Sequence, residues 1–373
     1  MKVKKLKKLL VSISEFSAKR LNLALAITSG IFLVVASGLY VWSHYSADKA
    51  LTNQMLHRQQ VIARSGAESI EHLFRATIDS ITLLSEREEL LTPTERQSAL
   101  DRYLANWKHF SIVGVFLTDE DGTIVVNSSN VGSKLVGQSI SERDYFKQAI
   151  REPKGEVFVS KPFISEIGNV AGDTILTFSI QVYDENGDFT GILTSVFLLN
   201  DVVNAYLDPL RISDATRISL LAPNGDFWYS QNIDLIDKNI YAVLDNFNFP
   251  GKSVFISKLT SGLNQLTEGK LDIVRPLEES EGVVIERSLI AYSPINYQHD
   301  NYLYLIVSNP ADEAFQFDST YKAMNFWMVI VVVAVVLAFS FFVVLVVRVA
   351  QRDSYIEGYI YGRDQMVHKP KEK

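Results

Sequence analysis

Two long apolar stretches without a charged residue constrain this chain more than any other feature of its sequence. They cover residues 21–43 and 326–347. As a helix rising about 1.5 Å per residue, the second stretch would extend roughly 33 Å, which is enough to cross the hydrocarbon core of a bilayer. Because backbone groups in hydrocarbon must be hydrogen-bonded within the segment, we expect two transmembrane helices. The first stretch is longer than the apolar part of a signal peptide, so we expect an anchor that is not cleaved.

The basic residues at the two ends of the chain predict its orientation. Seven Lys and Arg residues precede the first stretch, and six follow the second. Positively charged flanks stay on the cytoplasmic side of a membrane. We therefore expect a two-pass protein of the bacterial inner membrane. Its parts would be a basic cytoplasmic N-terminus at residues 1–20, a periplasmic region at residues 44–323 and a short cytoplasmic tail at residues 348–373.

The expected periplasmic region is acidic, with 23 Lys and Arg against 38 Asp and Glu and a net charge of −15. Such a surface repels nucleic acids and anionic lipids, so neither is expected as a partner. The sequence has no cysteine, which excludes disulfides and thiolate metal ligands. Its six histidines show no metal-binding spacing, and it carries neither a G-x-S-x-G nor a phosphate-loop motif. We expect no metal site, no cofactor and no enzymatic activity.

The segment that follows the first apolar stretch has the period of an amphipathic helix. Apolar residues recur there at steps of three and four: Ile62, Ile70, Leu73, Phe74, Ile78, Ile81 and Leu84. The pattern predicts a stalk helix over residues 46–91, ended or interrupted by Thr92-Pro93. A shorter helix is expected at residues 93–107, so that residues 44–106 form a stalk with a connecting helix.

A strand-turn-strand pattern then occurs twice, as LTDEDGTIVVNS at residues 117–128 and as LAPNGDFWYS at residues 221–230. Asp121-Gly122 and Asn224-Gly225 provide turn residues at equivalent places, with glycine taking a positive φ. The repetition predicts two related units in tandem, each with a central antiparallel sheet. The expected fold class is therefore α+β.

Further elements follow from local patterns. SERDYFKQAIR at residues 141–151 predicts a short helix capped by its first Ser and Glu. The DENGD turn resembles part of a calcium loop but lacks the glutamate at position twelve, so a hairpin is favoured. The remaining expected strands lie at residues 112–117, 123–126, 174–183, 189–198, 217–221, 226–229, 254–256, 283–292 and 302–307, with helices at residues 200–207 and from 312 onward.

Four segments in this order resemble the double Cache domain, a PAS-like extracytoplasmic sensor domain of bacterial and archaeal receptors. They are LTDEDGTIVVNS, SERDYFKQA, FVSKPF and SIQVYDENGDFTGILTSVFL. The resemblance covers roughly residues 46–320. It implies two PAS-like units on the stalk helix, a membrane-distal one at residues 107–207 and a membrane-proximal one at residues 208–323.

The resemblance also implies a small ligand in the distal unit. The family's carboxylate-binding arginine falls on Arg143, with Tyr145 and Phe146 as the aromatic wall. A guanidinium can hold a carboxylate with two parallel hydrogen bonds, and aromatic rings can close an apolar pocket. The alternative is a surface pair of Arg143 with Asp144 or Glu142.

One residue departs from the family's pattern. The aspartate that holds the ammonium group of amino acid ligands falls near Val196, and valine cannot offset a buried ammonium. The sequence therefore favours a carboxylate, another small metabolite or no ligand over an amino acid.

Only 26 residues follow residue 347, and they contain no recognisable output domain. We therefore expect a homodimeric membrane sensor that signals through its transmembrane helices to a separate membrane or cytoplasmic protein. One alternative is a truncated receptor, because the tail faintly resembles the start of a diguanylate cyclase domain. The other is an envelope assembly protein such as a polysaccharide chain-length regulator. Its second span would carry a Pro/Gly-rich motif, and its outer domain would be mostly helical.

Overall fold

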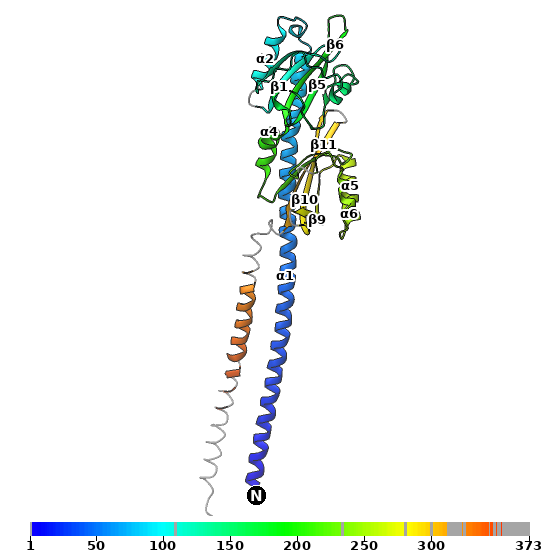
Figure 1. The fold of residues 1–373 in the computed structure, drawn as a ribbon. Coiled ribbons are helices and arrows are strands. Elements are labelled where there is room, and N and C mark those ends of the chain that lie inside the picture. The colour runs from blue at the N-terminus through cyan, green and yellow to red at the C-terminus, as the bar shows by residue number, and fades with distance from the viewer. Residues whose placement is uncertain are drawn as a thin grey trace, which may run out of the picture. The chain divides into compact units, whose positions relative to one another are not determined.

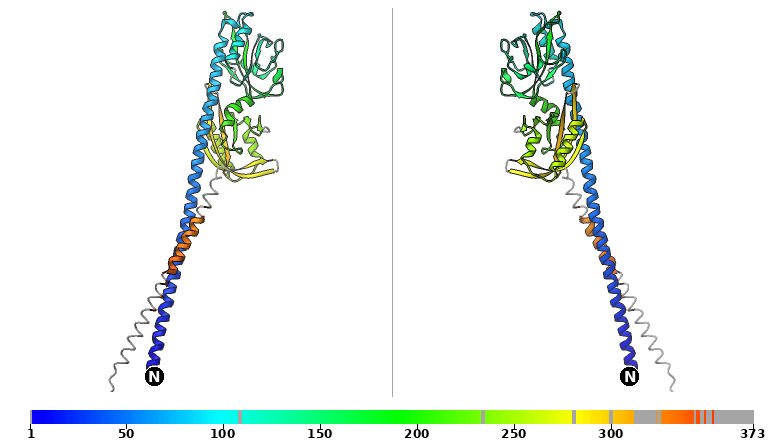
Figure 2. Two further views of the ribbon diagram at one scale, coloured as in Figure 1. Left: turned by 90° about the vertical axis from the view of Figure 1, so that its left-hand side faces the viewer. Right: turned by 90° about the vertical axis from the view of Figure 1, so that its right-hand side faces the viewer.

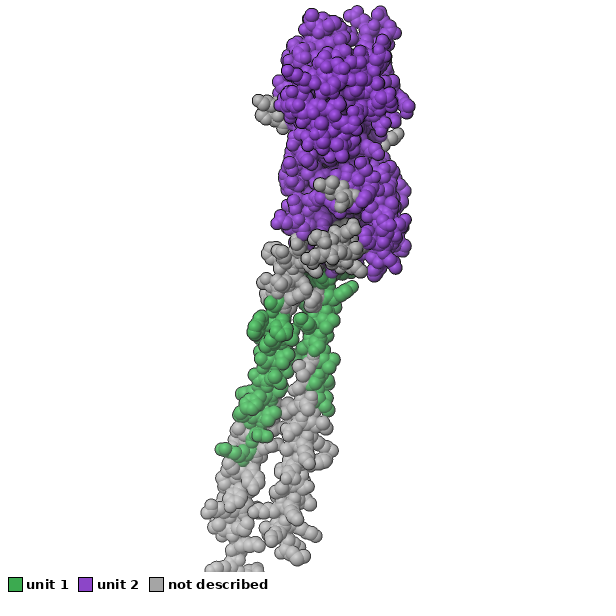
Figure 3. Space-filling model, viewed as in Figure 1, with its two compact units in different colours: residues 1–51, 315–373 green, residues 52–314 purple. Residues whose placement is uncertain are grey.

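The computed structural model describes residues 2–107, 110–232, 235–279, 282–298, 301–311, 323, 326–342, 344–345, 348 and 352. The chain divides into two compact units (Figure 3). One comprises residues 52–314, and the other comprises residues 1–51 with residues 315–373. Within the described residues, no helix is both long enough and apolar enough to cross a membrane. The start of the helix expected from residue 312 lies outside the described residues.

Helix α1 (Lys2–Ser85) confirms the predicted long helix (Figure 1). It ends before the Thr92-Pro93 pair that was expected to stop it. Leu84 and Leu90 are both buried in the same core cluster. Six residues further along a helix, a side chain has turned by about 120°, so a straight helix could not direct both residues to one core. The chain leaves the helix at Ser85 and passes through a 3-10 turn, η1 (Glu88–Leu90), into α2 (Arg96–Asn106).

The first sheet has the strand order β2-β1-β6-β5-β3, with β4 also paired to β5, and all its neighbours are antiparallel. Both predicted long strands, β5 and β6, are confirmed at their predicted bounds. Its strands are β1 (Ile112–Thr118), β2 (Ile124–Ser129), β3 (Phe158–Val159), β4 (Phe163–Ile164), β5 (Thr174–Tyr183) and β6 (Phe189–Leu198).

The second sheet has the order β8-β7-β11-β10-β9 and is also antiparallel. Each sheet, with the helices that pack on it, forms one of the two units expected from the sequence; the first unit contains the first sheet. In both, the first two strands form a hairpin at the sheet edge, and the last strand of the unit pairs with its first strand. This shared order confirms the expectation of two related units in tandem. The strands are β7 (Arg217–Leu221), β8 (Phe227–Ser230), β9 (Gly269–Glu279), β10 (Gly282–Gln298) and β11 (Asn301–Pro310).

The two edge hairpins are alike down to their hydrogen bonds. Gly122 and Gly225 have φ of 82° and 90°, as the turn requires. The Gly122 carbonyl accepts a hydrogen bond from the Ile140 backbone N–H at 2.9 Å, and the Gly225 carbonyl accepts one from Ile240 at 2.8 Å. Each turn is thereby tied to the segment that begins the next helix, α3 (Asp144–Ala149) in the first unit and α5 (Ile240–Asp245) in the second.

One face of α1 packs against both sheets and joins them in one core. Both sheets lie on the same side of the helix (Figure 2). The ring of Phe74 on α1 lies 5.2 Å from that of Phe178 on β5 and 5.3 Å from that of Tyr297 on β10, so one side chain contacts both sheets. The opposite face of the first sheet forms a core with α3, and that of the second with α5 and α6 (Lys252–Gln265).

One local prediction is wrong, and two elements were not predicted. Residues 254–256 were expected as a strand but lie in α6, where the buried Phe255, Leu259 and Leu263 form a stripe at four-residue steps. The second unit also contains α5 and β9, which the sequence patterns did not reveal. The predicted helix at residues 200–207 is present. It consists of α4 (Leu199–Val202) and a π-helical segment, η3 (Val203–Leu207), and a 3-10 turn, η4 (Asp208–Leu210), follows it.

Candidate ligand site on the first sheet

The arginine singled out from the sequence stands directly before α3. Arg143 is the N-cap residue of this helix, and this cap lies two residues after the predicted cap at Ser141. The reason is that residue 139 forms an isolated bridge with Thr123, and Ile140 bonds to Gly122. Ser141 therefore lies in a turn, closed by the hydrogen bond from the Arg143 backbone N–H to the Ile140 carbonyl, and the helix begins only after this turn.

The Arg143 guanidinium forms an ion pair with a residue that the sequence did not single out. Its Nη1 donates to Oε2 of Glu166, which follows β4. Glu142, one of the two neighbours considered as a partner, instead accepts a hydrogen bond from Lys147 Nζ at 2.7 Å. The Arg143 side chain is 32% exposed and that of Glu166 is 67% exposed. The guanidinium thus lies at the edge of the core, where it can reach both solvent and the interior.

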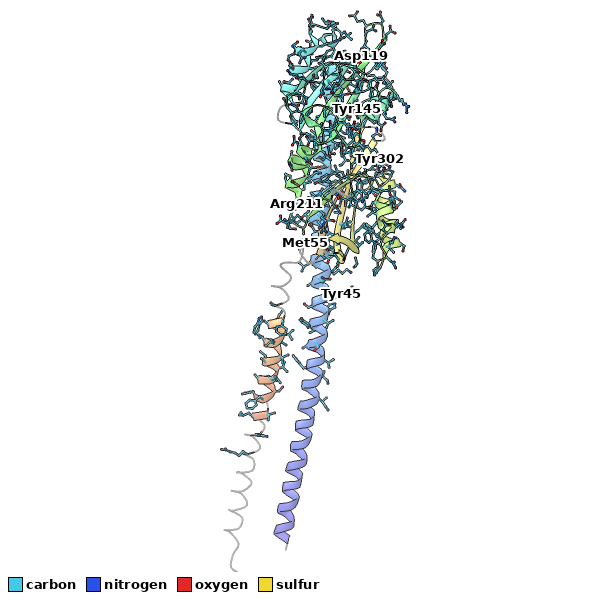
Figure 4. All side chains as sticks on the ribbon, in the orientation of Figure 1. Tyr45, Met55, Asp119, Tyr145, Arg211 and Tyr302 are labelled. Carbon is cyan, nitrogen blue, oxygen red and sulfur yellow. The ribbon has the colours of Figure 1, made fainter. Side chains whose placement is uncertain are left out.

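The two predicted aromatic residues are buried beside it. Tyr145 stacks on Phe163, with ring centroids 5.3 Å apart. Burial raises the pKa of the Tyr145 hydroxyl above its usual range, and the charge of Arg143 opposes this rise. Phe146 belongs to the same apolar core. Figure 4 labels Tyr145 among the side chains of the first unit.

A small cavity of about 30 Å³ lies on the same face of the sheet. Its apolar lining includes Val113, Phe116, Leu135, Val170 and Val196. This volume holds one or two water molecules and is far below the roughly 300–1,000 Å³ of a ligand pocket. Val196, the residue that departs from the family's pattern, gives this cavity an apolar wall. A larger ligand could enter only if the segments covering the sheet moved.

Buried hydroxyl groups line the neighbouring strands, and the sequence analysis missed them. Thr177 on β5 is opposite Val196 in the strand register, and its Oγ1 has no hydrogen-bond partner within the described residues. Ser179 and Thr194 share a hydrogen bond of 3.0 Å between their hydroxyl groups. Side chains alternate along β5, so Thr177 and Ser179 lie on the face away from α1, opposite to Leu176 and Phe178. The sequence did not single them out, because threonine and serine are also ordinary strand residues.

Residues 165–173, here called the 165–173 loop, cover this face. The loop is closed by hydrogen bonds from Ser165 N to Asp173 O and from Gly172 N to Ser165 O, both 2.8 Å long. Asn169 attaches it to the segment after β2, through its backbone N–H to Ser133 Oγ and its Nδ2 to the Val131 carbonyl, again at 2.8 Å each. The same loop supplies Glu166 to Arg143 and Val170 to the cavity.

The DENGD turn between β5 and β6 is a hairpin, as favoured from the sequence. The Asp184 carboxylate accepts hydrogen bonds from the backbone N–H groups of Asn186 at 2.9 Å and Asp188 at 2.8 Å. Bonding to the backbone, foremost at Asp188, lowers the pKa of the Asp184 carboxyl. Among the residues that the structure describes, no group of three or more His, Asp or Glu side chains is arranged to hold a metal ion.

The fold is that of an extracytoplasmic ligand-binding sensor domain. A model of the Cache domain family matches residues 46–316. The chain belongs to the Cache domain family, in agreement with the resemblance drawn from its sequence. Cache domains are sensory ligand-binding modules rather than catalytic ones. No curated protein sequence matches the chain.

Solved structures of chemoreceptor domains share the fold. The chain is similar to the ligand-binding domain of the amino acid chemoreceptor PctB of Pseudomonas aeruginosa PAO1 in complex with L-Gln, at 16% identity and a TM-score of 0.51, over 72% of this chain and 96% of that one. It is similar to that of the chemoreceptor CtaA of Pseudomonas fluorescens in complex with L-isoleucine, at 15% identity and a TM-score of 0.51, over 74% and 98%. A methyl-accepting chemotaxis protein X matches at 15% identity with a TM-score of 0.52, over 71% and 99%. At such identities the likeness concerns the fold alone.

Proposed function

We infer that this protein is a membrane-anchored sensor that binds a small carboxylate in its distal Cache unit and signals to a separate protein. The observation that carries this inference is the position of the Cache match. Residues 46–316 lie between the two apolar stretches of the sequence, as expected of a sensor domain held at both ends. The strands of the two sheets, within residues 112–198 and 217–310, support a distal unit at residues 107–207 and a proximal unit at residues 208–323.

Membrane anchoring is supported by the apolar side chains of the two stretches. Large apolar residues there are mostly exposed, for example Val34 at 72%, Trp42 at 68%, Phe339 at 67% and Phe341 at 69%. Exposed apolar surface on this scale requires a non-aqueous partner, and a bilayer fits stretches of this length. With the basic flanks, this supports a two-pass topology with residues 44–323 in the periplasm.

The carboxylate is supported by the chemistry around Arg143. The guanidinium is partly exposed, and it lies close to the Tyr145–Phe163 stack. The apolar wall that Val196 gives to the cavity does not favour an ammonium group. Arg143, Tyr145 and Phe146 would thus bind the carboxylate and enclose the rest of the ligand. The two-sheet architecture, in contrast, does not favour the envelope-assembly alternative, which implied a mostly helical outer domain.

Thermal unfolding of the purified full chain in detergent micelles tests this function. The chain would be heated with carboxylates, amino acids, amines and purines, each added separately. A ligand at one hundred times its Kd stabilises the folded state by about 2.7 kcal/mol, which corresponds to roughly 5–10 °C in Tm. We expect a carboxylate to raise Tm in the wild type but not in Arg143→Ala.

Lys147→Ala is the matched control for that experiment. Lys147 is a basic residue of the same helix, it is exposed, and it pairs with Glu142 rather than with the candidate site. Its variant should keep the full ligand-induced shift. If the ligand raises Tm equally in Arg143→Ala and in the wild type, Arg143 does not bind the ligand. If no compound raises Tm, the protein has no ligand in these classes of small molecule.

A further inference from the structure

The ion pair between Arg143 and Glu166 has a consequence for how the proposed site is occupied. Arg143 is the only residue of the site predicted to bind a carboxylate, and its guanidinium is already bonded to one. A second carboxylate at the same guanidinium would stand next to Glu166 and be repelled by it. Binding of a ligand carboxylate and formation of the Arg143–Glu166 pair therefore oppose each other.

The position of Glu166 links this competition to access. Glu166 belongs to the 165–173 loop, and Val170 of the same loop is one of the residues that line the apolar cavity. The cavity of about 30 Å³ is too small for a carboxylate ligand and is not lined by Arg143, so a site that joins the two requires the loop to move. Moving the loop away would also withdraw Glu166 from Arg143. One motion thus enlarges the cavity and frees the guanidinium.

The pair is weak enough to be displaced. The Glu166 side chain is 67% exposed, so solvent screens its attraction to Arg143. A ligand carboxylate held deeper, beside the buried Tyr145 and the partly buried Phe163, would be less screened than Glu166 is. The loop itself is held by the two hydrogen bonds of Asn169 and by the packing of Ile167 and Val170 on the core, contacts that a bound ligand would have to replace.

We propose that Glu166 is a tethered competitor for the ligand site, which holds Arg143 and the 165–173 loop closed until a ligand carboxylate replaces it. This inference rests on the proposed function. It makes Glu166 a specificity-determining residue, because only a carboxylate that binds Arg143 better than Glu166 does can open the site. Glu166→Gln removes the competing charge and nearly preserves the side-chain volume.

Titration calorimetry of the full chain in micelles tests the proposal, with acetate, propionate, pyruvate, succinate and L-alanine as probes at constant ionic strength. Propionate and L-alanine differ by one ammonium group, so they separate competition at Arg143 from recognition of an amino acid. We expect propionate or another carboxylate to bind Glu166→Gln about two to five times more tightly than the wild type. Arg143→Ala should bind it about tenfold more weakly or worse. The matched control Glu185→Gln, in the exposed β5–β6 turn, should bind like the wild type.

Each other outcome contradicts the competitor role of Glu166, alone or together with the proposed carboxylate ligand. If carboxylate binding depends on Arg143 but is unchanged in Glu166→Gln, the competitor role is wrong and the proposed function stands. If Glu166→Gln loses binding and L-alanine is preferred to propionate, Glu166 holds an ammonium group and the competitor role is again wrong. If no variant binds any of these carboxylates, the competitor role falls together with the proposed carboxylate ligand.

Discussion

At the scale of single residues, the turn glycines show how a local choice positions the candidate site. Gly122 lies against the start of α3, so the hairpin turn and the helix that carries Tyr145 and Phe146 are packed directly on each other. A Cβ atom built on Gly122 would come within 2.9 Å of Phe146 Cζ and 3.0 Å of the Ser141 backbone. Its φ of 82° adds strain for any residue with a side chain.

We expect Gly122→Ala to destabilise the protein more than Gly137→Ala. Gly137 has a similar φ of 88°, but its Cβ would meet nothing within 4 Å. The left-handed conformation alone should cost roughly 1–2 kcal/mol in Gly137→Ala. The contact with Phe146 and Ser141 should add about 1–3 kcal/mol in Gly122→Ala. Urea unfolding of both variants measures the difference in stability. Equal urea midpoints would show that a Cβ atom at position 122 meets no steric conflict with Phe146 and Ser141.

At the scale of elements, α1 has two different faces. One stripe of the helix is buried against both sheets, and the opposite stripe is exposed along residues 54–83. Helix length alone does not stabilise such an element, because most of its stability in a protein comes from packing of the apolar face. The contacts of the buried face should therefore decide whether both sheets stay packed on α1.

Ile70→Ala should destabilise the protein by about 2–5 kcal/mol, because Ile70 is fully buried and its truncation leaves a cavity in the core. The control Val254→Ala lies on α6 with its side chain 56% exposed, and its effect should stay within about 0.5 kcal/mol. Chemical unfolding followed by tryptophan fluorescence measures both. Similar losses in the two variants would mean that α1 is not held by its buried stripe.

At the scale of the whole molecule, the exposed stripe of α1 fits the homodimer expected from the sequence. The exposed residues recur at steps of three and four, the spacing with which two parallel helices pack along each other. Most of them are polar, so the contact would be modest. They are Gln54, Arg58, Val61, Ser65, Glu68, His72, Ala76, Asp79 and Leu83.

The absence of cysteine from the sequence makes the dimer simple to test. Around a two-fold axis along α1, Val61 of one copy would face Val61 of the other, so Val61→Cys should form a disulfide-linked dimer under mild oxidation. Glu185→Cys, in the β5–β6 turn, should remain uncrosslinked. Gel electrophoresis without reductant gives the result. Crosslinking at position 185 but not at 61 would place the contact between copies elsewhere.

The sequence by itself determined the elements whose patterns are local. Strands β5, β6 and β7 begin and end at the predicted residues, because alternation and the DENGD turn act within a few positions. The equivalence of Gly122 and Gly225 was equally visible, since each turn depends only on its own residues. The tandem architecture followed from that repetition.

Only the tertiary structure decided what depends on distant partners. The segment around Phe255 has β-prone residues, but it is helical because its four-residue stripe is buried against the second sheet. Glu166 is 23 residues from Arg143, and no local pattern distinguishes it from other surface glutamates. The sequence could indicate that Arg143 binds a carboxylate. Which carboxylate reaches it depends on how the 165–173 loop packs, and packing is a property of the folded chain.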